Sequence, residues 1–320
     1  MNASSNHCAI CVQNVTKRYG SFTAVDDLTF EVRPGEIFAM LGPNGAGKTT
    51  TLRMILDILK PDTGSIEILG GPLTDATKDR IGYLPEERGL YRDVPVLDVL
   101  TYLAQLKGVP RAEAQRRATA MLQQVGLEAN AKSKVSELSK GMQQKVQIIA
   151  TVLHRPALVI IDEPFSGLDP VNTQMIKDLL YDMNREGVTI VMSTHQMNYI
   201  EEMADRLLMI DHGRRVLYGS VQEVRERFAE NAVVVEGTGD WAALPGVGKV
   251  DVSETGREVT LHLADGVAPD QIMHAVAVDP AYHVRRFELA VPSLTEIFIQ
   301  VAGGSNHNNG NSHGAARNGG

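Results

Sequence analysis

Long apolar runs are absent from this sequence of 320 residues. Nothing in it reaches the roughly 18 consecutive apolar residues that a bilayer-spanning helix needs. The start, MNASSNHCAICVQNV, lacks the basic segment followed by an apolar one that marks a secretory signal. These absences predict a cytoplasmic protein, and any role at a membrane would require a partner that supplies the spans.

Positive charge is also scarce, with 31 Lys and Arg against 39 Asp and Glu, a formal net charge of −8. Nucleic-acid binding rests largely on basic side chains that neutralise phosphates. We therefore expect no nucleic-acid partner.

Cysteine occurs only twice, at Cys8 and Cys11 beside His7. The C-x-x-C spacing could supply half of a zinc site, but no second C-x-x-C completes the usual four ligands. We expect two ordinary thiols in a reducing compartment.

The residues that are present describe a globular protein, with 43% hydrophobic and 22% charged side chains. From about residue 8 to 228, short apolar or β-branched runs alternate with longer helical patterns. This alternation favours an α/β fold with a mainly parallel sheet, and short Gly-containing connections between the early strands suggest an antiparallel flank. The expected strands are 9–15, 25–32, 36–41, 64–69, 157–162, 188–194 and 206–211, and the expected helices are 48–59, 96–107, 112–125, 143–153, 171–185 and 196–203.

The pattern changes near Phe228. Beyond it, the runs AVVVEG, VTLHLAD and VRRFELAV read as strands, with helices expected over 269–276 and 293–301. We expect an N-terminal extension over 1–7, a large domain over 8–228 and a small α/β domain over 229–302. The Gly/Asn/His-rich segment 303–320 is expected to be a disordered tail.

A phosphate-binding loop is indicated by GPNGAGKTT, which fits G-x-x-x-x-G-K-[ST] between an expected strand and an expected helix. Its glycines would let backbone N–H groups surround phosphate oxygens, assisted by the helix N-terminus. Lys48 would reach the β- and γ-phosphates, and Thr49 would ligate Mg²⁺. The expected contact residues are Gly42, Pro43, Asn44, Gly45, Ala46, Gly47, Lys48, Thr49 and Thr50.

Two adjacent acids end the apolar run LVIID. A strand ending there would place Asp162 at the carboxyl edge of the sheet, near the phosphate loop, where it could hold the Mg²⁺ shell. Glu163 follows and would orient and activate water for attack on the γ-phosphate.

A second candidate phosphate site lies in ELSKGMQQK, far along the chain from the first. Ser139 could simply cap a helix, yet Ser139 and Gly141 also have the chemistry of a phosphate clamp.

These motifs, together with SGLD and STH, resemble in order and approximate spacing the ATP-binding subunits of ABC transporters, over residues 10–228. The resemblance implies an ABC-type fold with a helical subdomain, and an ATPase that uses ATP and Mg²⁺. It also implies a homodimer or heterodimer in which Ser139 and Gly141 bind the γ-phosphate of ATP held by the opposite subunit.

The resemblance assigns roles to further residues. Tyr19 would stack on adenine, with a plain strand tyrosine as the alternative. His195 would contact the γ-phosphate, and Asp169 would communicate across the subunit interface. Asp169 precedes Pro170, so a helix N-cap is a competing role for it.

Departures from the family pattern occur at three positions. Lys140 and Met142 replace Gly and Gln of the usual signature, and Glu86 stands where many relatives carry Gln. A carboxylate at Glu86 could ligate Mg²⁺ or a water bound to it. It could instead pair with Arg88 or Arg92 as a surface acid.

The run EERGLY, the small C-terminal domain and PSLTEIFIQ resemble ATPase subunits of bacterial sodium-extrusion or drug and antibiotic exporters. The resemblance therefore implies export of ions or small molecules through separately encoded permease subunits, with this chain at the inner face of the cell membrane. An ABC-type ATPase acting on ribosomes or another macromolecule is the alternative.

Overall fold

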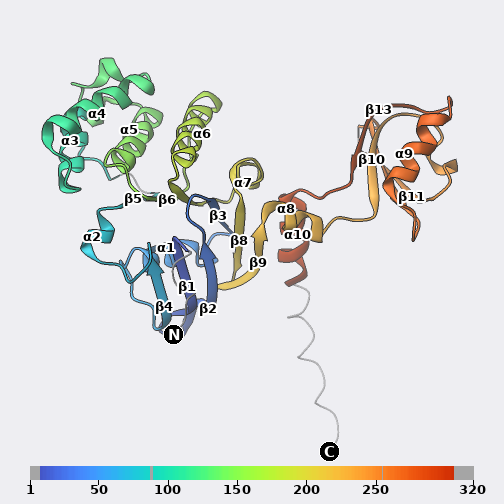
Figure 1. Ribbon diagram of the computed structural model, residues 1–320, viewed down its shortest axis with the longest axis horizontal. Helices are drawn as coiled ribbons and strands as arrows, with labels where there is room; N and C mark the ends of the chain where they lie inside the picture. The colour runs from blue at the N-terminus through green and yellow to red at the C-terminus, as the bar shows by residue number, and fades with distance from the viewer. Residues whose placement is uncertain (1–7, 87–88, 254, 306–320) are drawn as a thin grey trace, which may run out of the picture. The chain divides into compact units, whose positions relative to one another are not determined.

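The computed structural model describes residues 8–86, 89–253 and 255–305 (Figure 1). The chain forms two compact units, Met1–Val221 and Gln222–Gly320. This division falls earlier than the boundary expected after residue 228, because most of α8 (Val221–Arg227) belongs to the second unit. Arg225 of α8 donates hydrogen bonds to the carbonyls of Pro292 and Val291 at 3.0 and 3.4 Å, which fasten it there.

A six-stranded sheet forms the centre of the first unit, in the order β5-β6-β7-β3-β8-β9. The first five strands in this order are parallel and β9 is antiparallel to β8. The strands are β3 (Ile37–Leu41), β5 (Ile81–Leu84), β6 (Leu158–Asp162), β7 (Thr189–Ser193), β8 (Arg206–Asp211) and β9 (Arg214–Ser220). Every residue of β3, β6 and β7 is buried, which explains why these strands read as continuous apolar runs.

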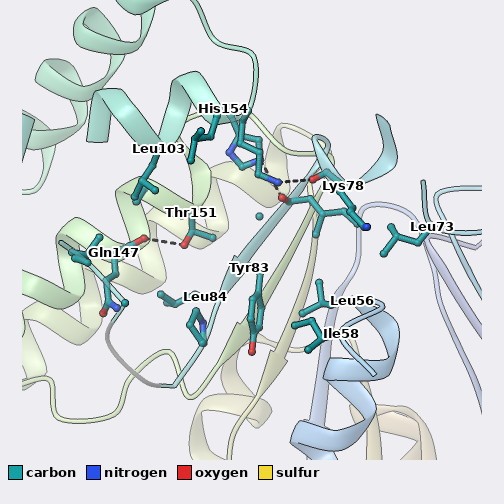
Figure 2. Close-up of a pocket in the computed structure, with 18 residues that line it drawn as sticks. Leu56, Ile58, Leu73, Lys78, Tyr83, Leu84, Leu103, Gln147, Thr151 and His154 are labelled. Carbon is teal, nitrogen blue, oxygen red and sulfur yellow. Dashed lines mark hydrogen bonds between the residues drawn. The ribbon is translucent and has the colours of Figure 1, made fainter. Parts of the chain in front are cut away.

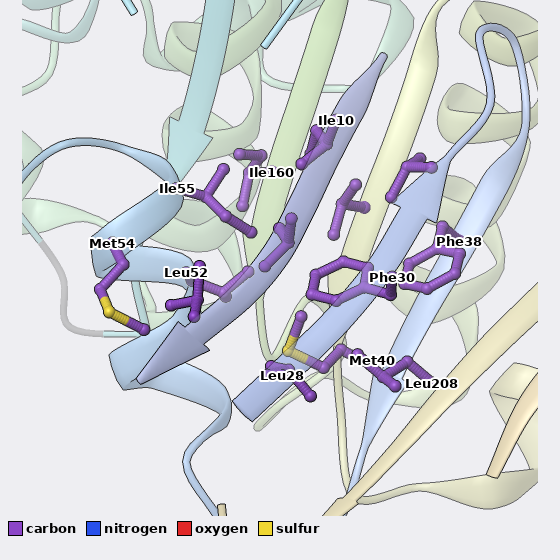
Figure 3. Packing of buried hydrophobic residues seen from close by; sticks show 14 of the residues in the cluster. Ile10, Leu28, Phe30, Phe38, Met40, Leu52, Met54, Ile55, Ile160 and Leu208 are labelled. Atoms are coloured by element: carbon purple, nitrogen blue, oxygen red, sulfur yellow. The ribbon is translucent and has the colours of Figure 1, made fainter. Parts of the chain in front are cut away.

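A three-stranded antiparallel sheet of β1 (Ile10–Tyr19), β2 (Phe22–Val32) and β4 (Thr63–Ile68) confirms the expected antiparallel flank. Its buried side chains pack with α1 (Lys48–Ile55) against one face of the six-stranded sheet (Figure 3). The rings of Phe30 and Phe38 stack at the centre, 5.7 Å apart. The short helix α2 (Asp75–Lys78) follows β4.

Three helices form a separate group within this unit, drawn in green in Figure 1. They are α3 (Val96–Leu106), α4 (Arg111–Gln124) and α5 (Lys140–Val152), accompanied by short 3₁₀ turns at Glu128–Asn130 and Val135–Glu137. Buried Val, Leu, Ile and Ala side chains from all three helices make a core of their own. The helical subdomain implied by the family resemblance is therefore present.

An apolar cavity of about 440 Å³ lies where this helical group meets β5 and the segments after α1 and β4 (Figure 2). Its walls include Leu56, Tyr83, Leu84, Leu103 and His154. The Nε2 atom of His154 lies 3.2 Å from the carbonyl oxygen of Ile81, the first residue of β5. We refer to this space below as the β5 cavity.

Two further helices pack against strands of the six-stranded sheet. Helix α6 (Pro170–Arg185) contacts β7, and α7 (Met197–Met203) contacts β3. Among the described residues, no helix has the length and apolar character required to cross a membrane.

The second unit holds a four-stranded antiparallel sheet in the order β11-β12-β10-β13. Its elements are β10 (Ala232–Thr238), a 3₁₀ turn at Trp241–Ala243, β11 (Val247–Val252), β12 (Glu258–Leu263), α9 (Pro269–Val278), β13 (His283–Leu289) and α10 (Leu294–Ser305). Side chains from α9, such as Ile272 and Val276, pack with Val233, Val235 and Trp241 to form its core. Helix α10 continues through residue 305, three residues into the expected tail (303–305); residues 1–7 and 306–320 lie outside the described part of the chain.

Cys8 and Cys11 form a disulfide, so the expectation of two free thiols is wrong for this structure. Cys8 lies before the start of β1, and the chain bends at Ala9. The strict alternation of a strand does not apply there, and the two Cα atoms approach to 5.9 Å, within the range that a disulfide spans.

Candidate nucleotide-binding and hydrolysis site

Sheet topology brings the candidate residues to one edge. The carboxyl ends of the parallel strands β5, β6, β7 and β3 lie side by side in that order. The phosphate loop follows β3, His195 follows β7, Asp162 ends β6 and Glu86 follows β5. Segments distant in sequence therefore meet at the edge where α/β sheets place their ligands.

The phosphate loop depends on two glycines. Gly42 has φ 152° and Gly47 has φ 109°, in the region that L side chains rarely adopt. A Cβ atom on Gly42 would lie 2.1 Å from the carbonyl oxygen of Ile210, and one on Gly47 would lie 2.5 Å from that of Ala24. Both positions exclude any side chain.

Lys48 lies across this loop, where its Nζ donates hydrogen bonds to the carbonyl oxygens of Gly42 at 2.7 Å and Pro43 at 3.1 Å. Burial lowers the pKa of Lys48, while the charges of Glu163, Asp162 and Glu86 oppose that decrease. The surrounding carboxylates thus favour the cationic form that a phosphate would bind.

Asp162 and Thr49 are brought together, with the Thr49 hydroxyl donating to Asp162 Oδ2 at 3.2 Å. Burial raises the pKa of Asp162, while the neighbouring hydroxyls of Ser193 and Thr49 act in the opposite direction. Ser193 is its neighbour across the strand pair, and the buried Ser193 Oγ makes no well-formed hydrogen bond with another described residue. Two hydroxyl groups and a buried carboxylate therefore lie together at this point.

Glu163 has an unusual backbone, with φ 54° in the left-handed region. Its amide donates to the carbonyl of Ser193 at 2.8 Å. Its carboxylate accepts a hydrogen bond from the Thr194 hydroxyl at 3.1 Å and from the His195 amide at 3.2 Å. The Nδ1 atom of His195 lies 2.8 Å from the same carboxylate.

A cavity of about 470 Å³ contains most of the candidate residues. Its lining comprises Tyr19, Phe22, Ala24, Asn44, Gly45, Gly47, Lys48, Thr49, Thr50, Glu86, Asp162, Glu163, Ser166 and His195. Tyr19 and Phe22 face each other across the hairpin of β1 and β2, with 48% and 61% of their surface exposed. Two exposed aromatic rings thus form part of one wall of the cavity, where a planar base could stack on them.

Ser139, Gly141 and Asp169 do not line this cavity. Ser139 caps α5 by accepting a hydrogen bond from the Met142 amide at 3.3 Å, and Asp169 caps α6 through the Asn172 amide at 2.9 Å. The helix-cap roles left open by the sequence are therefore present at both positions. Lys140 begins α5 and is exposed.

Glu86 is exposed at the cavity wall, and Arg88, one of its two possible partners, lies outside the described residues. No group of three or more His, Cys, Asp or Glu side chains suited to a metal occurs among the residues that the structure describes. A cation here would therefore depend on Asp162, Thr49 and oxygens from a bound phosphate.

Sequence reasoning missed Phe22, Ser166, Ser193 and Thr194 as neighbours of the site. Thr194 could have been found from its position between a buried strand and His195. A hydroxyl there lies close to the residue that follows the neighbouring strand, which is Glu163. Phe22 could have been found from YGSF, which puts two aromatic residues on the two sides of a tight turn.

Comparisons with known proteins show the family of this chain. The ABC transporter family model matches residues 25–166. The uncharacterised ABC transporter ATP-binding protein YhaQ of Bacillus subtilis is 40% identical over 92% of this chain and 98% of its own length. The chain belongs to the ABC transporter ATP-binding proteins. It is thus an ATPase of the ABC type, and its residues 219–302 match the model described as ATP-binding protein DrrA1-3-like, C-terminal domain.

Other members of this family carry functional names. The linearmycin resistance ATP-binding protein LnrL of Bacillus subtilis is 31% identical over 91% of this chain and 97% of its own length. The Nod factor export ATP-binding protein I of Paraburkholderia xenovorans is 38% identical over 66% of this chain and 71% of its own. A solved ATP-binding subunit of an ABC transporter matches with a TM-score of 0.65 at 34% identity, covering 69% of this chain and 93% of that one.

Proposed function

We propose that this ABC protein hydrolyses ATP at the edge formed by β5, β6, β7 and β3, with Glu163 as the residue that activates water. The observation that carries the proposal is the fixed position of the Glu163 carboxylate, which Thr194 and His195 hold at the same edge as Lys48. A carboxylate so placed can accept a proton from water as it attacks the γ-phosphate. Lys48 stabilises the charge on the phosphates, and His195 contacts both Glu163 and the transferred group.

Mg²⁺ fits the oxygen donors at this edge. Asp162 and the Thr49 hydroxyl would hold the ion or its waters, and the poorly paired Ser193 hydroxyl beside them is compatible with a hydrated shell. Such an ion neutralises charge on the β- and γ-phosphates. Glu86 faces the same cavity, where it would accept a hydrogen bond from a bound water.

A second subunit would complete the site with Ser139 and Gly141. Gly141 is not required by its own fold, since a Cβ atom there would meet Asn172 at 3.5 Å and Leu168 at 3.9 Å, both ordinary contacts. Glycine within a helix is unfavourable compared with alanine, so the bare backbone has a use in binding. We assign it to close approach of the phosphate bound by an identical or similar partner subunit.

The β5 cavity is the proposed contact for a membrane permease. Its walls are mainly apolar, and the exposed side chains of Ile58 and Leu106 border it. The strand beneath it, β5, leads directly to Glu86 in the nucleotide cavity. A permease segment seated there would register the state of the nucleotide. We propose export of a small molecule as the transport function. The names of two relatives, one for linearmycin resistance and one for Nod factor export, support it.

The test is Glu163→Gln, which preserves shape but removes the base. We expect ATP binding to remain, and turnover to fall by roughly 10²–10⁴-fold, the usual contribution of a general base. Nucleotide-bound dimers should accumulate, as size-exclusion chromatography with ATP would show.

The matched control is Glu186→Gln, an exposed acid at the C-terminal end of α6 that is expected to have normal turnover. Normal turnover by Glu163→Gln would remove Glu163 from the proposed role.

A further inference from the structure

The contact between α6 and α7 contains a cluster that neither the motifs nor the proposed hydrolysis uses. The ring of Tyr199 in α7 contacts two partners, the ring of Phe165 and the ammonium of Lys177. The ring centroids of Tyr199 and Phe165 are 4.4 Å apart, and Lys177 Nζ lies 4.7 Å from the centroid of Tyr199.

Lys177 is unusual because it is a charged residue of α6 with only 6% of its surface exposed. Its Nζ forms an ion pair with Glu202 of α7. A buried ammonium needs compensation by opposite charge or by an aromatic face, and here both come from α7. The charge of Lys177 therefore links α6 to one particular placement of α7.

The hydroxyl of Tyr181 on α6 also donates to the carbonyl of Glu202 at 2.9 Å. Tyr181 therefore contacts the backbone of α7, whereas the ring contacts of Tyr199 within the described chain are with Phe165 and Lys177. Tyr181 thus provides a comparison within the same interface.

The three segments joined by Tyr199 each lead to the site. Phe165 is two residues after Glu163, and α7 begins two residues after His195. Helix α6 begins at Pro170, four residues after Ser166, which lines the nucleotide cavity. A shift of α7 relative to Phe165 would alter the approach of His195 to Glu163, whose atoms now lie 2.8 Å apart.

We infer that Tyr199 and Lys177 are positioning residues that keep α7, and hence His195, aligned with Glu163 during hydrolysis. This inference rests on the roles proposed above for Glu163 and His195. Neither side chain lines the nucleotide cavity, so both act through α7 and the segment after Glu163. Their loss should therefore lower kcat and leave the KM for ATP nearly unchanged.

The first measurement compares Tyr199→Leu with Tyr199→Phe. Leucine removes the aromatic face that meets Lys177 and Phe165, so we expect kcat to fall by roughly 10–100-fold, the scale of a displaced catalytic group. Phenylalanine keeps the face and should restore turnover to near the wild-type value. Tyr181→Phe removes a hydrogen bond from the same helix contact, and we expect it to leave kcat unchanged.

Lys177→Met and Lys177→Arg form a second pair. Methionine keeps the apolar stem but removes the charge, and should lower kcat in the same way, whereas arginine can stack on the ring and should restore part of it. If Tyr199→Leu fails to bind ATP because it does not fold, this pair decides, since Lys177→Met leaves the rings of Phe165 and Tyr199 in place. An unchanged kcat for Lys177→Met would overturn the inference.

The decisive readout is Tyr199→Leu in a His195→Ala background, measured by single-turnover hydrolysis. If Tyr199 acts through His195, its substitution should add little once His195 is absent. If Tyr199→Leu lowers the hydrolysis rate as much in the His195→Ala background as in the wild type, the positioning role is contradicted. The role of Glu163 would be unaffected by that result. Full turnover by His195→Ala alone would instead count against the proposed hydrolysis mechanism itself.

Discussion

Thr194 contacts the Glu163 carboxylate through a single buried hydroxyl. It is fully buried, its Oγ1 donates to Glu163 at 3.1 Å and its amide donates to Met40 at 3.2 Å. Thr194→Val keeps the shape but leaves one carboxylate oxygen of Glu163 without this donor. We expect kcat to fall by about tenfold, on the scale of one lost hydrogen bond to a charged group, with ATP affinity unchanged. Thr194→Ser keeps the hydroxyl and serves as the control; equal loss in both variants would indicate a packing effect.

Single residues differ in how far the sequence could place them. Gly42, Lys48, Thr49 and Asp162 belong to motifs whose spacing already implies a phosphate site, and the structure brings all four together. The left-handed backbone of Glu163 leaves no such trace, because non-glycine residues adopt it only when tertiary contacts over-determine it.

At the scale of elements, the parallel strands and most helices follow from apolar periodicity, because burial on both faces imposes continuous apolar runs. The expected strands at β3, β6, β7 and β8 are confirmed, as are α3 and α6 to within a residue or so at each end. Strand β5 was missed because IGYL is short and contains Gly82, where a Cβ atom would meet the Thr151 carbonyl at 2.4 Å. Strands β9 and β11 were missed because polar and glycine residues interrupt their alternation.

His154 makes the contact between the helical group and β5 sensitive to pH. Its pKa falls from 6.5 to about 4, chiefly because of burial and also because of the charge of Lys107, while the Ile81 carbonyl opposes the change. The folded state thus binds this proton less readily than the unfolded state. Its stability should be complete above pH 6.5 and decline as the pH falls from 6.5 towards 4.

Urea unfolding of the wild type and of His154→Gln at about pH 7.5 and about pH 5 measures this contribution. Glutamine can still donate to the Ile81 carbonyl but does not titrate. Between the two pH values, the wild type should lose about 2 kcal/mol more of its unfolding free energy than the variant. Equal losses in both proteins would show that His154 does not govern the pH response of this contact.

At the scale of the whole molecule, the sequence holds one copy of each phosphate-binding motif. The two motifs lie at different places on the chain's surface. Lys48 lines the nucleotide cavity, whereas Ser139 lies outside it at the start of α5. Ser139 acting on the nucleotide of its own chain and Ser139 acting on that of a partner subunit predict different activities for a mixture of two inactive variants.

Lys48→Ala and Ser139→Ala should each hydrolyse ATP poorly when pure. If Ser139 acts on the nucleotide of its partner, a mixed dimer holds one site with both wild-type residues and one site with neither. Equal mixing should then restore roughly a quarter of the wild-type rate, since half of the dimers are mixed and each has one complete site. If Ser139 acts within its own chain, both sites of a mixed dimer stay defective and no activity returns. Ser136→Ala, an exposed serine in the preceding turn, controls for loss of a nearby hydroxyl and should be fully active alone.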